Sequence, residues 1–127
     1  MQLGKFVLLL PLLLAPAALG CGSDLMASVS GLQVEPTPAS AGDEVRLVFL
    51  LQVIPERSYT ITVFIDGEEH GSRTRTESVS GSAEYVLGDA ADLIARYGIG
   101  VHQARVRLDI PQDSRTLETQ EASFELQ

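Results

Sequence analysis

The stretch Glu-Val-Arg-Leu-Val-Phe-Leu-Leu-Gln-Val at residues 44–53 has the clearest hydrophobic pattern in the chain. Apolar side chains recur at every second position, the period that places them on one face of a β-strand. The expected inward residues are Val45, Leu47, Phe49, Leu51 and Val53. The opposite face carries Arg46, Val48, Leu50 and Gln52, which is apolar enough in its middle to predict partial cover by a neighbouring segment or a tether. The stretch is therefore predicted to be a core strand.

Segments with similar alternation lie on both sides of this strand, and turn residues separate them. On the amino-terminal side, residues 32–35 are followed by Pro36 and Pro38, which cannot donate to a central ladder and so favour an edge strand. On the carboxyl-terminal side, strands are predicted at residues 59–66, 72–77, 83–87, 101–110 and 117–126. Turns are predicted at residues 55–58, at Asp66-Gly67 and at residues 111–114, and Asp-Gly favours a tight hairpin.

One helix interrupts this series of strands. Asp89 is a candidate N-cap, residues 90–97 carry an apolar stripe, and Gly98 is typical of a helix end. Ile99 is expected to pack back on Ile94. In the last hairpin, Arg105 and Arg107 are expected to share the solvated face with Glu121 and Glu125 and to form ion pairs with them.

About seven short strands in a domain of this size are typical of an immunoglobulin-like fold. The predicted architecture is all-β: an antiparallel sandwich over residues 32–127, with one short helix in a crossover between the sheets.

The first twenty residues have the anatomy of a secretion signal. Lys5 precedes an apolar run that contains Pro11 and Pro16 and is too short to span a bilayer comfortably. Small residues then precede Cys21, the only cysteine of the chain. We therefore expect a signal peptide at residues 1–20, cleavage between Gly20 and Cys21, and a flexible tether over residues 21–31.

The junction Ala18-Leu19-Gly20-Cys21 resembles the lipobox of bacterial lipoproteins. That resemblance implies acylation of Cys21 and attachment to a membrane through the lipid. Gly22 and Ser23 after the cysteine resemble a signal for sorting to the outer membrane, although the extracytoplasmic face of the plasma membrane stays open. The alternative is an ordinary signal peptide with a free thiol at Cys21.

Residues 35–45, 62–68 and 100–106 together resemble the bacterial CARDB-type and related immunoglobulin-like domains of cell-surface proteins. The resemblance implies a role in adhesion, scaffolding or presentation at the cell surface, without catalysis. No cofactor is expected.

The charge of the chain excludes one class of partner. Without residues 1–20, eight arginines face seventeen acidic side chains, which gives a formal charge of −9. Such a surface repels phosphate backbones, so we expect no nucleic-acid binding.

Catalytic and metal-binding patterns are weak. In an extended strand Asp66, Glu68 and His70 would share one face and could bind a divalent ion, but an exposed acidic turn is the favoured interpretation. His102, the other histidine, is expected to be a structural residue of a core strand. The sequence contains none of the common nucleophile, phosphate or dinucleotide motifs, so the chain is not expected to be an enzyme.

Three functions remain for the domain. The favoured hypothesis is a membrane-anchored binding or adhesion module that recognises another envelope or surface protein, and it requires an exposed patch. A purely structural envelope lipoprotein requires no such patch. A carbohydrate-recognition accessory protein requires an aromatic platform, and the sequence contains no tryptophan.

Overall fold

The computed structural model of the chain describes residues 24–127. The predicted signal peptide, its cleavage between Gly20 and Cys21 and the lipidation of Cys21 lie outside the described residues. The described elements are β2 (Met26–Glu35), β3 (Glu44–Ile65), β4 (Glu68–Asp89), α1 (Ala90–Tyr97), β5 (Gly100–Ile110), the 3₁₀ turn η2 (Pro111–Asp113), β6 (Arg115–Glu118) and β7 (Ala122–Leu126).

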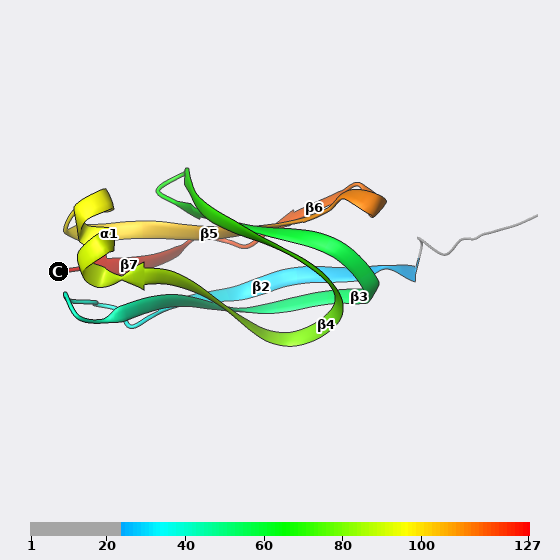
Figure 1. Cartoon of the computed structure of the whole chain (residues 1–127), viewed down its shortest axis with the longest axis horizontal. Coiled ribbons are helices and arrows are strands. Elements are labelled where there is room, and N and C mark those ends of the chain that lie inside the picture. Colours follow the sequence, from blue (N-terminus) through cyan, green and yellow to red (C-terminus); the bar gives the residue numbers. More distant parts are fainter. Residues whose placement is uncertain (1–23) are drawn as a thin grey trace, which may run out of the picture.

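Two long strands, β3 and β4, contribute to both layers of the molecule (Figure 1). The first half of β3 pairs with β2 and with the second half of β4. The second half of β3 pairs with the first half of β4 and with β5, and β5 pairs with β6 and β7. All of these pairings are antiparallel. The fold is therefore the predicted all-β immunoglobulin-like sandwich, although the bounds of several strands differ from those predicted.

The turn predicted at residues 55–58 is wrong, because β3 continues through it. Pro55 lies where the ladder between β3 and β4 shifts register, between Val53 and Arg57. A proline is tolerated at such an irregularity because no ladder hydrogen bond depends on its missing N–H. The segments predicted as two strands at residues 72–77 and 83–87 are likewise one bent strand, β4.

The predicted boundary between tether and domain is also wrong. Strand β2 begins at Met26, and residues 26–30 pair with residues 50–54 of β3. Val29 is buried in the core. The small polar residues that predicted a tether instead form the solvated face of an edge strand, since β3 supplies the partner backbone that the local sequence does not reveal.

The core contains the predicted inward face of residues 44–53, each of whose apolar residues is at most 2% exposed. The second sheet contributes alternating residues of β3 and β5, among them Ile61, Val63, Val106 and Leu108. On the outer face, Leu50 is 55% exposed. The cover predicted for that face is therefore absent at Leu50 within residues 24–127.

Helix α1 spans the predicted residues and buries Ala90 and Leu93. Its carboxyl end is closed by the Gly98 amide, which donates to the Ile94 carbonyl over 2.8 Å. The predicted packing of Ile99 on Ile94 is wrong, because Gly98 (φ 92°, ψ 165°) directs the chain outward and leaves Ile99 73% exposed.

Within residues 24–127 no helix is long and apolar enough to cross a membrane.

The strand predicted at residues 117–126 is interrupted between β6 and β7. Thr119 bridges the break: its hydroxyl accepts from the Val106 amide over 3.0 Å, and its own amide donates to the Val106 carbonyl over 2.9 Å. The break changes the charge pairing, so Arg105 lies 3.8 Å from Glu118 and Arg107 lies 3.0 Å from Asp109. The ion pairs predicted with Glu121 and Glu125 are therefore not formed.

Because β4 bends, residues from its two halves meet inside the sandwich. The Tyr85 hydroxyl occupies the place that a methyl group on Gly71 would need. We expect Gly71→Ala to lower the free energy of unfolding by about 1 kcal/mol through overpacking, measured by urea denaturation. Tyr85→Phe should restore most of the loss in the double variant, whereas equal losses in both backgrounds would contradict this contact.

Candidate functional site

The two ends of the molecule differ. The described chain enters at the end that carries η2 and the bend of β3 and β4 (Figure 1). Helix α1 and the end of β7 lie at the opposite end, which we call the distal end. Three features are candidates for function: a histidine cluster beside α1, an exposed apolar tip at residues 99–101, and a groove between the two sheets.

His102 is buried, with 6% of its surface exposed, and both ring nitrogens face acceptors. Its Nδ1 lies 2.7 Å from the Asp66 carboxylate and its Nε2 lies 2.8 Å from the Gly98 carbonyl oxygen. Only the imidazolium form can donate to both acceptors. Asp66 also accepts from the Gln103 amide over 2.9 Å. His102 therefore ties the β3–β4 turn to the end of α1 and the start of β5.

The charges in this cluster follow from its contacts. Burial alone would lower the pKa of His102, but the hydrogen bonds to Asp66 and Gly98 and the charge of Asp66 outweigh it and raise that pKa. Burial would raise the pKa of Asp66, whereas the hydrogen bonds from His102 and Gln103 lower it. The pair is thus held as imidazolium and carboxylate, as expected of a structural histidine.

His70 is engaged in a second set of contacts. Its Nε2 donates to the Leu87 carbonyl oxygen over 3.0 Å, and its Nδ1 lies 2.6 Å from the Tyr97 hydroxyl. The Arg96 guanidinium stacks on the Tyr97 ring at 5.0 Å. Burial raises the pKa of Tyr97, and the charge of Arg96 opposes that increase.

The predicted metal candidates do not converge. Asp66 points to His102, and His70 uses both nitrogens on Tyr97 and Leu87, so neither joins Glu68 in a shared site. Among residues 24–127, no three His, Cys, Asp or Glu side chains lie close enough to hold a metal ion. Sequence reasoning did not identify Tyr97 as a partner of His70, because only the packing of α1 against β4 brings them together.

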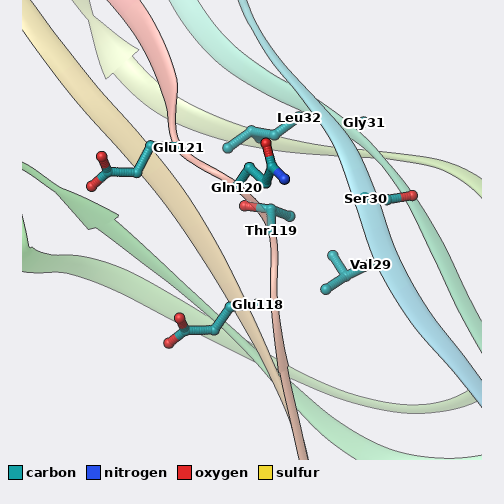
Figure 2. A pocket seen from close by; sticks show the side chains of 8 residues that line it. All are labelled: Val29, Ser30, Gly31, Leu32, Glu118, Thr119, Gln120 and Glu121. Carbon is teal, nitrogen blue, oxygen red and sulfur yellow. The ribbon is translucent and has the colours of Figure 1, made fainter.

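A groove of about 410 Å³ lies on the open side of the sandwich (Figure 2). Its walls are residues 29–32 of β2 and residues 118–121, which comprise the last residue of β6 and the segment that joins β6 to β7. Both walls are irregular where they face each other. Gly31 and Leu32 fall in a register shift of the β2–β3 ladder, and Gln120 and Glu121 fall in the break between β6 and β7.

The side chains of the groove divide into two groups in Figure 2. Leu32, Gln120, Thr119 and Val29 lie between the two walls, whereas Ser30 and the two glutamates, Glu118 and Glu121, point away from the space. The interior is therefore half apolar and half amide or hydroxyl, and the carboxylates stand on its rim.

Large exposed apolar side chains occur outside the groove. In the described part of the chain they are Met26, Leu50, Val86, Ile99 and Val101. Ile99 and Val101 are 73% and 65% exposed and belong to the distal tip. All of them are aliphatic, so no large exposed aromatic side chain lies within residues 24–127.

The contacts of His102 with Asp66 and Gly98 predict a pH dependence of stability. Because folding raises the pKa of His102, protonated His102 stabilises the fold fully below about pH 6.5, and this stabilisation is lost as the pH rises through the pKa of the folded state. Because folding lowers the pKa of Asp66, its stabilisation is present above about pH 3.8 and is lost as the pH falls through the pKa of the folded state. We expect His102→Gln to cost about 1 kcal/mol near pH 5.5, because solvent screens the 44% exposed Asp66 side chain. The cost should shrink by pH 9 in urea titrations, and a cost that grows with pH would contradict the assignment.

Comparison with known proteins supports the architecture. No family model and no curated protein matches the chain. Among solved structures, the chain is similar to the CARDB domain of a Pyrococcus furiosus protein, in complex with di-metal ions, with a TM-score of 0.54, 8% identity, and coverage of 81% of this chain and 89% of that one. It also matches 17% of the length of β-glucosidase 3B from Thermotoga neapolitana in complex with α-D-glucose, with 80% of this chain covered, 18% identity and a TM-score of 0.40. At these identities the likeness shows the fold alone, an immunoglobulin-like sandwich similar to a CARDB domain.

Proposed function

We propose that the chain is a lipid-anchored, extracytoplasmic binding module without catalytic activity, held in the cell envelope through Cys21. The lipid would attach it to the outer membrane or to the extracytoplasmic face of the plasma membrane. The observation that carries the binding role is the distal tip, where Ile99 and Val101 are largely exposed at the end opposite to the entry of the chain.

The distance between the proposed anchor and the domain is short. Strand β2 begins at Met26, five residues after Cys21, and five extended residues span roughly 17 Å. An anchor at Cys21 would therefore keep the end with η2 near the bilayer and direct the distal tip away from it. Two or more acyl chains make such anchoring stable, at about 0.8 kcal/mol for each buried CH₂.

The chemistry of the tip suits a protein partner. Exposed aliphatic side chains at a tip favour an apolar pocket on a partner surface. A negatively charged domain disfavours nucleic acid as that partner.

The competing functions have less support. A carbohydrate-recognition protein would need an exposed aromatic platform, and the described part of the chain has no large exposed aromatic side chain. A purely structural lipoprotein would not need an exposed aliphatic tip. The proposed lack of catalysis is supported by the two histidines, whose four ring nitrogens all make internal hydrogen bonds.

The anchor predicts a specific modification. Mass spectrometry of the membrane fraction should find an acylated amino-terminal peptide that begins at Cys21. Cys21→Ser should abolish acylation and release the protein from that fraction, because no other cysteine can take its place. A mature wild-type protein with an unmodified thiol would contradict the anchor.

The proposed binding role predicts that substitutions at the distal tip weaken partner binding. Ile99→Ser with Val101→Ser should reduce recovery of a crosslinked envelope partner by about tenfold or more, the effect of removing an interface hot spot. Leu50→Ser with Val86→Ser is the matched control, because it removes two exposed aliphatic side chains elsewhere. Equal recovery with both double variants, each with wild-type circular dichroism, would contradict the role of the tip.

A further inference from the structure

We propose that the free edge of β2 and the groove beside it bind an extended, lysine- or arginine-containing segment of a partner protein, which pairs with the exposed backbone as an added strand. This inference rests on the proposed binding function and gives it a second surface and a partner chemistry. The distal tip does not contribute to it.

The first argument is the protection of the edges. Strands at sheet edges carry charges that discourage pairing with other chains. The edge strand β4 carries Glu68, Glu69, Arg73, Arg75 and Glu77 in its first half alone. In contrast, residues 26–34 of β2 contain no charged residue and no proline, and among the described strands β2 pairs only with β3. Strand β2 therefore has an edge that no charged side chain protects between residues 26 and 34.

The second argument is the backbone on both walls of the groove. Residues 31–32 stand outside the ladder with β3, and residues 120–121 stand outside the ladder with β5. The Thr119 hydroxyl, and not the backbone of residues 120–121, accepts the hydrogen bond from the Val106 amide. The peptide groups of both irregularities thus border the same space, and extended peptides bind by pairing with such groups.

The third argument is where the open side closes. Ala39 forms a parallel bridge with Leu126, with hydrogen bonds of 2.9 Å to the Glu125 carbonyl and from the Gln127 amide. This bridge covers the edge of β7 near the distal end, and no other residue between 24 and 127 forms an equivalent bridge at residues 118–121. The groove lies beyond this bridge, on the same open side of the sandwich.

The negative charge of this chain favours a cationic partner segment. Glu121 stands on the rim, Glu118 beside it lies 3.8 Å from Arg105, and the chain beyond residue 20 has a formal charge of −9. A segment with cationic side chains on either side of its β-forming residues would gain attraction at the rim, and an acidic segment would be repelled.

The test uses the full chain, purified in detergent, and three decapeptide probes. The first alternates valine and threonine with lysine, the second replaces each lysine by glutamate, and the third keeps the lysines but has proline at two central positions. We expect the lysine peptide to bind at least about tenfold more tightly than either of the others in titration calorimetry, because repulsion weakens the second and lost N–H donors weaken the third. Equal affinity for the lysine and proline peptides would mean charge attraction without strand pairing and would overturn the proposal.

Variants of Gln120 locate the site. Gln120 is exposed and its side chain lies between the two walls. Gln120→Lys should weaken the lysine peptide by about fivefold and Gln120→Glu should strengthen it by a similar factor. Gln112→Lys in η2 adds the same charge at an exposed position away from the groove and should leave the affinity unchanged.

Hydrogen exchange provides the structural readout. The bound lysine peptide should protect amides of residues 28–32 and 119–121, and protection along β4 instead would overturn the proposal. The tip variants separate this inference from the proposed function: loss of the envelope partner in those variants, without peptide binding to the groove, would leave the binding role in place and remove the groove from it.

Discussion

The continuous hairpin of β3 and β4 is the constraint on which the rest of the structure depends. In β3 the buried apolar positions are odd-numbered on both sides of the bend, from Val45 to Val53 and from Tyr59 to Ile65, so the same face of β3 points inward in both sheets. The Arg57 guanidinium, 2.7 Å from Asp113, ties the bend to η2. One hairpin therefore builds parts of both layers and closes one side of the sandwich. The other side, bounded by β2 and by β6 and β7, stays open, and the position of the groove is a consequence of this topology.

Local sequence predicted the strands that carry strict alternation and the helix between Asp89 and Gly98, because those signals lie within a few residues of each other. It could not predict that Pro55 lies inside a strand, since that depends on a register shift against β4. It also missed residues 26–31, whose strand exists because β3 offers a partner backbone. In both cases the deciding interaction is distant in the sequence.

The candidate site shows the same limit. Asp66, Glu68 and His70 have the spacing of a possible metal site, but a ligand must have a free lone pair. Helix α1 brings the Tyr97 hydroxyl to His70, and the start of β5 brings His102 to Asp66. Asp66 is held on His102 and His70 on Tyr97 and Leu87, so the three side chains do not share one site. The structural role expected for His102 is confirmed, although its acceptors, Asp66 and the Gly98 carbonyl, could not be deduced from sequence spacing.

The irregularity in β2 can be interpreted in two ways, and the residues involved distinguish them. A bulge that blunts an edge acts together with charges or proline that obstruct an incoming strand. The irregularity in β2 instead involves Gly31, at φ +65°, and Leu32, which lies toward the groove. Gly31 suits this left-handed backbone conformation, and Leu32 offers apolar contact at the groove. Among residues 24–127, no charged side chain or proline stands on β2 between residues 26 and 34, and the break between β6 and β7 lies across the groove from it. Together, the two irregularities favour the binding of an added strand.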